Sequence, residues 1–208
     1  MNSALVDGIV KAVLYEGYML YPYRPSAVKN RQRFNFGVVY PRAYSEAQGG
    51  TDLCLMQTEC LVEGNKATQC AVRVRFLRMV SRSIEKLRRP VSELASELEA
   101  NLEKVERLEV NGKTFQAWQE AVEETIEVTE FNLSALASQP MQWPFRMSAN
   151  QEKELIRDEN GFIAGIISRD KSNLRGTIEI SAASLVPGLH QLRVSISNDS
   201  PLDGGCTA

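Results

Sequence analysis

Short runs in which apolar and polar residues alternate constrain this chain more than any other feature of its sequence. The clearest runs cover residues 53–62, 67–80, 125–131, 177–181 and 189–197, and turn-forming residues separate them. Alternation with a period of two is typical of strands that bury one face. Because these strands do not alternate with helical segments, the sequence predicts a mainly β protein, an antiparallel two-sheet β-sandwich formed as a single domain by residues 1–208.

Turn-forming residues indicate which of these runs pair with each other. Residues 63–66 separate two runs and predict a hairpin between residues 53–62 and 67–80. Asn111 and Gly112 are the strongest two-residue turn signal and predict a short hairpin over residues 108–115. Pro187 and Gly188 predict the turn between the last two strands.

Two segments are predicted to be helical. Residues 133–138 predict one helical turn. Apolar residues also recur at spacings of three and four residues, after Pro90, at Val91, Leu94, Leu98, Leu102 and Val105. Such spacing places side chains on one face, so the sequence predicts a helix over about residues 91–106, within a helical insertion that covers residues 82–107. A face packed on the domain core is the favoured interpretation, and a coiled-coil seam is the alternative.

The N-terminal segment is rich in tyrosine. All six tyrosines of the chain lie between Tyr15 and Tyr44. Apolar and aromatic residues dominate residues 10–23 and 34–40, and a polar stretch that contains a proline, residues 24–32, lies between them. Because β-branched and aromatic residues favour strands, the sequence predicts two strands joined by a loop.

Charge and hydropathy argue against several classes of protein. A formal net charge of -2 argues against a dedicated nucleic-acid-binding protein. The N-terminus lacks the basic region and long apolar run of a secretory signal, and no window approaches the ~20 apolar residues of a membrane span. The cysteines lack metal-type spacing such as C-x-x-C, and three of them lie in apolar strand-like runs, which indicates reduced core thiols. These features together predict a cytoplasmic protein.

Catalytic motifs are missing from the sequence, and no cofactor is predicted. The single histidine, His190, shares its strand parity with Leu192 and Val194, so a structural role is the favoured interpretation. No G-x-S-x-G accompanies it, and Gly49, Gly50 and Thr51 lack the lysine of a phosphate-binding loop. The alternative, a metal-handling protein or metal-dependent enzyme using His190 with Cys54, Cys60, Cys70 and Cys206, stays open.

The tyrosine-rich segment is also the candidate interaction surface. Tyrosine and arginine are the residue types that most often anchor protein interfaces. The candidate residues are Tyr15, Tyr18, Tyr21, Tyr23, Arg24, Lys29, Asn30 and Arg31. We therefore expect a non-catalytic protein that binds another protein. A weaker alternative is an RNA-binding module that uses Arg73, Arg75 and Arg82 on a strand face.

The same segment carries a resemblance to a known group of proteins. Residues 13–18 (VLYEGY) and 20–24 (LYPYR), followed by residues 36–38, 74–77, 118–122 and 192–201, resemble an uncharacterised bacterial protein family encoded beside nickel–iron uptake hydrogenases. The resemblance implies an accessory protein in hydrogenase assembly or maturation, with a hydrogenase subunit or maturation factor as partner. Because members of that family are longer, it also implies that residues 1–208 correspond to the N-terminal part of a longer family domain.

Overall fold

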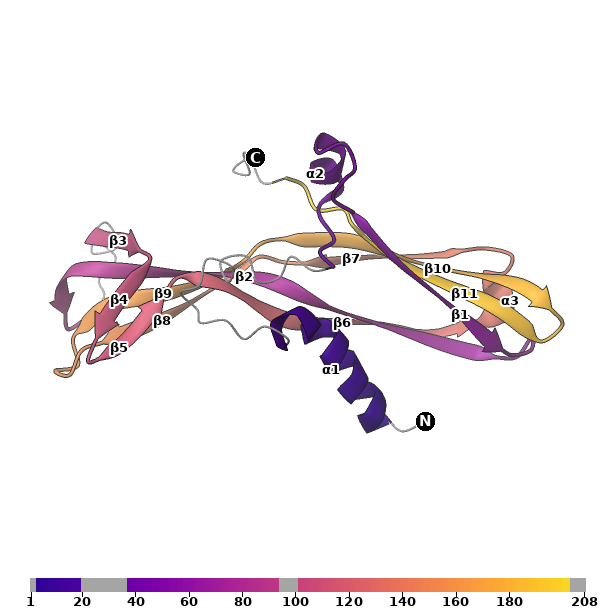
Figure 1. Ribbon diagram of the computed structural model, residues 1–208, viewed down its shortest axis with the longest axis horizontal. Helices are drawn as coiled ribbons and strands as arrows, with labels where there is room; N and C mark the ends of the chain where they lie inside the picture. The colour runs from indigo at the N-terminus through magenta and orange to yellow at the C-terminus, as the bar shows by residue number, and fades with distance from the viewer. Residues whose placement is uncertain (1–2, 20–36, 94–100, 203–208) are drawn as a thin grey trace. The chain divides into compact units, whose positions relative to one another are not determined.

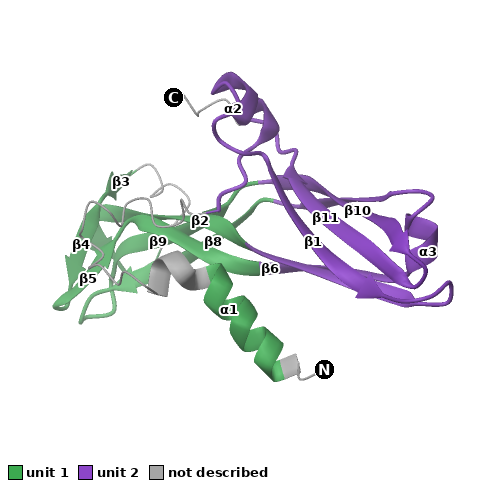
Figure 2. Ribbon diagram, turned by 45° about the vertical axis from the view of Figure 1, so that its right-hand side comes forward, with its two compact units in different colours: residues 1–35, 77–123, 149–172 green, residues 36–76, 124–148, 173–208 purple. Residues whose placement is uncertain are grey.

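The computed structural model describes residues 3–19, 37–93 and 101–202 of the chain. Its elements are mostly antiparallel strands, which confirms the prediction of a mainly β protein. The residues group into two compact units (Figure 2). Unit 1 comprises residues 1–35, 77–123 and 149–172, and unit 2 comprises residues 36–76, 124–148 and 173–208. No helix in the described ranges has the length and apolar character needed to cross a membrane.

Unit 2 contains a four-stranded antiparallel sheet in the order β1–β11–β10–β7. The strands are β1 (Leu55–Glu63), β11 (Leu189–Asn198), β10 (Leu174–Val186) and β7 (Met141–Met147). Figure 1 shows β1, β11 and β10 running alongside one another. Gly188, with φ of 84°, makes the turn between β10 and β11, which confirms the predicted turn.

A second layer of unit 2 comes from two long strands, β2 (Gln69–Val91) and β6 (Trp118–Asn132), which pair with each other. Val128 of β6 and Ile178 and Ile180 of β10 are fully buried in one cluster, and Val72 and Val74 of β2 pack against it. Both layers thus share one core, as a sandwich-like arrangement requires. The predicted alternation of residues 72–76 places the valines toward this core.

Unit 1 contains the sheet order β3–β2–β9–β8, formed by β3 (Leu102–Val105), the later part of β2, β9 (Ile163–Lys171) and β8 (Asn150–Arg157). A separate hairpin joins β4 (Arg107–Val110) to β5 (Lys113–Gln116). Asn111 and Gly112 have φ of 53° and 70°, as a type I′ turn requires, which confirms this predicted hairpin. Leu108 of the hairpin is buried with Ile84, Ile156 and Ile167, so the hairpin covers part of the sheet.

The described helices are α1 (Ser3–Met19), α2 (Arg42–Ala47) and α3 (Leu133–Leu136). The last confirms the predicted helical turn. It begins at Asn132, whose side-chain oxygen accepts hydrogen bonds from the backbone N–H groups of Ser134 and Ala135. Ahead of α2, the Asn198 side chain donates to the carbonyl oxygen of Val39 at 2.9 Å, which ties this segment to the end of β11.

The predicted strands in the tyrosine-rich segment are wrong wherever the structure describes them. Residues 10–19 belong to helix α1, and residues 37–40 form a turn and irregular backbone. The remaining residues of those two predictions, 20–23 and 34–36, lie outside the described residues. The apolar positions 5, 6, 9, 10, 13 and 14 recur every three to four residues, which favours a helix. The predicted strand begins at residue 10 and so leaves out the first half of this pattern.

The predicted helix over residues 91–106 is also wrong in the described ranges. Residues 82–91 continue strand β2, and residues 102–105 form β3, whose Val105 and Leu102 pair with Ile84 and Leu87. Ile84 and Leu87 are both buried although their side chains leave opposite faces of the strand. A strand covered on both faces loses its period of two, and its apolar residues then imitate helical spacing. Residues 94–100 lie outside the description.

The two strands predicted over residues 53–62 and 67–80 are present, but the prediction that they pair with each other is wrong. β1 pairs with β11, and β2 pairs with β3, β6 and β9, so the two strands lie in different sheets. Residues 64–68 therefore connect the two layers of unit 2. Here Gly64 donates its N–H to the carbonyl oxygen of Gly188 at 2.9 Å, beyond the end of the β1–β11 ladder.

Candidate functional site

The candidate site is an apolar stripe on helix α1, formed by Leu5, Val6, Ile9 and Val13. Leu5, Ile9 and Val13 are 65%, 58% and 65% exposed, and Val6 is also exposed. An α-helix turns by about 100° per residue, so these four side chains lie within an arc of roughly 100°. Among residues 4–14, whose side chains the structure describes, the half-buried ones are Asp7, Val10 and Leu14. The helix thus presents its apolar stripe to solvent.

Exposed large apolar side chains that adjoin one another are unusual on a monomer surface and mark places where another molecule binds. The described side chains of α1 add little charge to the stripe, since Asp7 and Lys11 are their only charged members. An apolar helical face with this spacing is the form in which helices bind an apolar groove of another protein. The four side chains of the stripe are hydrocarbon, so the stripe can support binding through apolar contact.

The structure partly locates the predicted interaction residues. Tyr15 and Tyr18 lie in the last turns of α1, directly after the apolar stripe. The other candidates lie outside the described residues, namely Tyr21, Tyr23, Arg24, Lys29, Asn30 and Arg31. Leu5, Ile9 and Val13 were not among the predicted interaction residues, and their spacing of four residues is the signal that places them on one face of a helix.

A cluster of charged side chains lies in unit 1, around Glu120 of β6. Its Oε1 accepts hydrogen bonds from Arg82 at 3.1 Å and from the Trp118 indole at 2.9 Å. Its Oε2 accepts from Arg169 of β9 at 3.0 Å, and Arg169 also donates to Glu154 of β8 at 2.8 Å. The cluster therefore joins strands from across the sheet.

Electrostatics keeps the Glu120 carboxylate ionised. Burial alone would raise the pKa of Glu120, but hydrogen bonds from Trp118 and Arg169 and the charges of Arg169 and Arg82 outweigh it, so its pKa lies below the usual value. The same carboxylates, first Glu154 and then Glu120, raise the pKa of Arg169. A carboxylate with a lowered pKa is a poor general base at neutral pH, so this cluster has the chemistry of a structural ion-pair network.

The arginines of the RNA-binding alternative are largely engaged with carboxylates. Arg73 donates to Glu127 at 2.6 Å, and Arg82 is held by Glu120. Arg82 also lies over the Trp118 ring, with its Cζ 5.4 Å from the ring centroid. A basic face that binds phosphates needs cations that are not already neutralised. Arg73 and Arg82 therefore give little support to RNA binding.

His190 lies near the core of unit 2, as its strand parity predicts. It is buried on β11, and its Nδ1 atom is buried and lacks a hydrogen-bond partner in the described structure. Cys54 and Cys70 are half-buried and Cys60 is exposed, all three as free thiols, so the prediction of core thiols is wrong for Cys60. Within residues 3–19, 37–93 and 101–202, the structure brings together no group of three metal-binding side chains. Cys206 lies outside these ranges.

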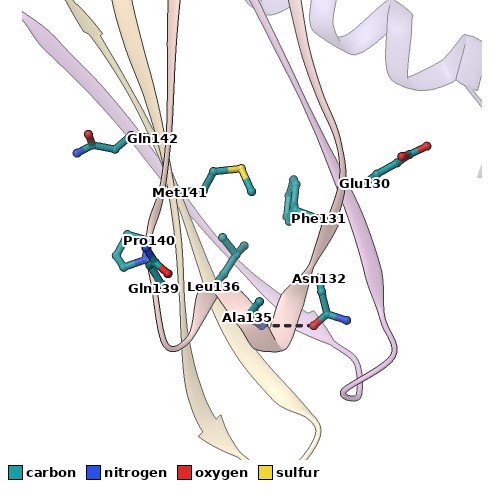
Figure 3. Close-up of a pocket in the computed structure, with 9 residues that line it drawn as sticks. All are labelled: Glu130, Phe131, Asn132, Ala135, Leu136, Gln139, Pro140, Met141 and Gln142. Atoms are coloured by element: carbon teal, nitrogen blue, oxygen red, sulfur yellow. Dashed lines mark hydrogen bonds between the residues drawn. The ribbon is translucent and has the colours of Figure 1, made fainter.

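An open cleft of about 500 Å³ lies beside α3 in unit 2. In Figure 3, Phe131 and Met141 point toward one another in this cleft, while Glu130 and Gln142 point away from it. Small-molecule sites usually combine an apolar cavity with several convergent polar groups. The side chains directed inward here are apolar, and Phe131 and Leu136 are part of the buried core. The cleft therefore offers no set of groups that would define a ligand.

Comparison of the sequence with protein families and with curated proteins, and of the structure with solved structures, finds no match.

Proposed function

We propose that this protein is a non-catalytic accessory protein that binds another protein through helix α1. The observation that carries the proposal is the exposure of Leu5, Ile9 and Val13 at four-residue spacing on one side of the helix. In water, burying these three side chains against a partner would remove a large apolar surface from solvent, which favours association. The partner is a protein that offers an apolar groove to this helix.

A protein groove fits α1 better than a membrane surface does. Helices that lie in the membrane interface carry many lysines and arginines on their polar face. The sequence of α1 contains Lys11 as its single basic residue, together with two acidic residues, Asp7 and Glu16. Attraction to anionic lipids is therefore weak, and the apolar contact alone has to provide the affinity.

The partner proposed from the sequence is a subunit or maturation factor of a nickel–iron hydrogenase. This identity is a prediction from the resemblance of residues 13–24 to the family encoded beside such enzymes. It is compatible with the position of the stripe, because Tyr15 and Tyr18 follow the stripe on the same helix. Tyr23 and Arg24 come a few residues later in the sequence and would extend the binding surface.

Affinity capture from a native extract of a hydrogenase-producing bacterium tests the proposal. The full chain should retain a protein partner, and the double variant Ile9→Glu/Val13→Glu should lose it, because two carboxylates would have to be buried. Lys11→Glu is the matched control, since Lys11 is exposed on the same helix outside the stripe. Circular dichroism of all variants confirms that the fold is kept.

The same capture experiment distinguishes the location of the binding site from the identity of the partner. Capture of a hydrogenase-related protein that is also weakened by Tyr23→Ala and Arg24→Ala would support the full proposal. A specific partner of another kind would leave α1 as the binding site and remove the hydrogenase assignment. If the Ile9→Glu/Val13→Glu variant retains the same proteins as the unmodified chain, α1 is not the binding site.

A further inference from the structure

Strand β1 is one edge of the four-stranded sheet of unit 2, and among the described residues β11 is the one strand that pairs with it. Two hydrogen bonds at the ends of this ladder show which residues face β11. The carbonyl oxygen of Cys54 accepts from the N–H of Asn198 at 3.1 Å, and the N–H of Gly64 donates to Gly188 at 2.9 Å. The register between them is unbroken. In an antiparallel ladder such pairs alternate, so the backbone groups of residues 55, 57, 59, 61 and 63 point away from β11.

This edge lacks several of the features with which proteins protect exposed strands from pairing, although it carries two carboxylates, Glu59 and Glu63. Natural edge strands carry prolines, lysines or bulges that block the approach of another strand. Residues 55–63 contain no proline, lysine or glycine. The opposite edge of the same sheet, β7, contains Pro144 opposite Thr177 of β10. The two edges therefore differ, and β1 is the edge that is open to pairing.

The side chains of β1 are arranged almost as a palindrome. Residues 55–61 read Leu-Met-Gln-Thr-Glu-Cys-Leu, so positions at equal distance from Thr58 carry similar side chains. About Thr58, Leu55 corresponds to Leu61, Met56 to Cys60 and Gln57 to Glu59. Leu55, Met56 and Leu61 are 45%, 57% and 66% exposed. A palindromic strand is self-complementary in the antiparallel direction, as a two-fold symmetric interface requires.

We propose that β1 pairs with β1 of a second copy of this chain, antiparallel, with the two-fold axis between the two Thr58 residues. Leu55 then lies opposite Leu61 of the second copy on one face of the joined sheets, and Met56 lies opposite Cys60 on the other. Gln57 lies opposite Glu59 of the second copy. Within each copy Glu59 already accepts from Gln57 at 3.2 Å and from Arg193 at 2.7 Å, so its charge is balanced before the two strands meet. The exposed apolar side chains of each strand thus meet apolar side chains of the other.

The backbone agrees with this register. It pairs residue 55 with 61 and residue 57 with 59, and these are the residues whose N–H and C=O groups point outward. Each such pair can exchange two hydrogen bonds. A register centred on Glu59 would place the two Glu59 carboxylates opposite each other and each Leu61 opposite a Gln57, which is unfavourable. Strand β1 is a surface separate from α1, so pairing through β1 is independent of the proposed function.

Cysteine cross-linking of the full chain tests the register directly. The background replaces the native thiols by Cys54→Ser, Cys60→Ser, Cys70→Ala and Cys206→Ser. In it, Thr58→Cys places two thiols at a pair whose Cα atoms are about 4.5 Å apart, within the range that a disulfide spans. Glu63→Cys is the matched control, because Glu63 is also exposed on β1 but its copies would lie roughly 30 Å apart. Under mild oxidation Thr58→Cys should form covalent dimers at least tenfold faster than Glu63→Cys.

Sedimentation equilibrium provides an independent readout. The unmodified chain should form dimers, and Leu61→Lys should weaken them at least tenfold, because a lysine would face Leu55 of the second copy. Leu185→Lys is the matched control, since Leu185 is 49% exposed and lies on β10. A chain that stays monomeric at its highest soluble concentration would overturn the proposal, and so would equal cross-linking rates at positions 58 and 63. Neither result would bear on capture of a partner through α1.

Discussion

The guanidinium of Arg82 lies over the indole ring of Trp118, with its Cζ 5.4 Å from the ring centroid. The two residues also share an acceptor, because both donate a hydrogen bond to Oε1 of Glu120. Arg82 is largely withdrawn from solvent, with 15% of its side chain exposed, and its Nε atom is buried without a hydrogen-bond partner in the described structure. The charge of Arg82 is therefore balanced by one carboxylate and one aromatic face.

Replacing that carboxylate should destabilise the fold strongly. In Glu120→Gln, Arg82 and Arg169 lose their shared counter-charge while Arg82 stays largely buried. We expect the free energy of unfolding to fall by about 2 kcal/mol, because removing one member of a buried ion pair leaves the other uncompensated. Urea denaturation followed by tryptophan fluorescence measures this change. Glu154→Gln is the control, since Glu154 is 58% exposed and its pair with Arg169 should contribute less than about 1 kcal/mol. An equal loss in both variants would contradict the assigned role of Glu120.

The same carboxylate should make stability depend on pH. The pKa of Glu120 is lower in the folded state than its usual value, because hydrogen bonds and nearby arginines outweigh burial, so the folded state favours the ionised form. The resulting stabilisation is complete above the unfolded pKa and is lost as the pH falls through the lower folded pKa. The difference in urea midpoint between the unmodified protein and Glu120→Gln should therefore be full at pH 7 and shrink below about pH 4. A difference that is constant down to pH 2 would show that ionisation of Glu120 is not its source.

Gly176 leaves no room for a side chain. A Cβ atom at this position would collide with the carbonyl oxygen of Ser197 on β11 and with the ring of Phe145, its cross-strand neighbour on β7. Gly176→Ala should therefore lower the free energy of unfolding by about 2 kcal/mol, since a backbone carbonyl cannot move aside. Gly8→Ala is the matched substitution, because a Cβ there meets nothing within 4 Å and alanine favours helix. It should leave stability unchanged or raise it, and thermal unfolding of the two variants checks the contrast.

The Asn132 side chain both caps helix α3 and holds the connection before β2. Its Oδ1 accepts from the N–H of Ser134 at 2.9 Å at the start of α3, and its Nδ2 donates to the carbonyl oxygen of Lys66 at 2.7 Å. Asn132→Ala removes both bonds and should cost about 1 to 2 kcal/mol. Asn132→Asp keeps the capping acceptor and loses the donor, so it should cost less. Chemical denaturation of the two variants would refute the capping role if aspartate were as damaging as alanine.

The sequence predicts a strand well where one face of the strand is buried and the other is exposed to solvent. Residues 125–131, 177–181 and 189–197 all lie in strands β6, β10 and β11. Local turn chemistry is equally reliable at Asn111 and Gly112, because a two-residue turn with positive φ at both positions needs no tertiary context. The pairing of β1 with β11 depends on contacts that are distant in the sequence, so the turn at residues 63–66 wrongly suggested a local hairpin.

The site was less predictable than the fold. Tyr15 and Tyr18 favour a strand because aromatic residues are common in strands, whereas the spacing of Val6, Ile9 and Val13 indicates the helix that forms. Propensity is a weak signal that periodicity overrides over several turns. The exposure of the stripe on α1 could not be read from the sequence at all, since an apolar helical face is more often packed on a core.

Strands β2 and β6 are each shared between the two compact units. β2 contributes residues 69–76 to unit 2 and residues 77–91 to unit 1, and β6 passes back from unit 1 to unit 2 after residue 123. No single cut of the chain can therefore yield an intact half for expression by itself. Deletion fragments would expose newly severed strands that adhere to unrelated proteins, so the binding surfaces of this chain have to be mapped with point variants of the whole molecule.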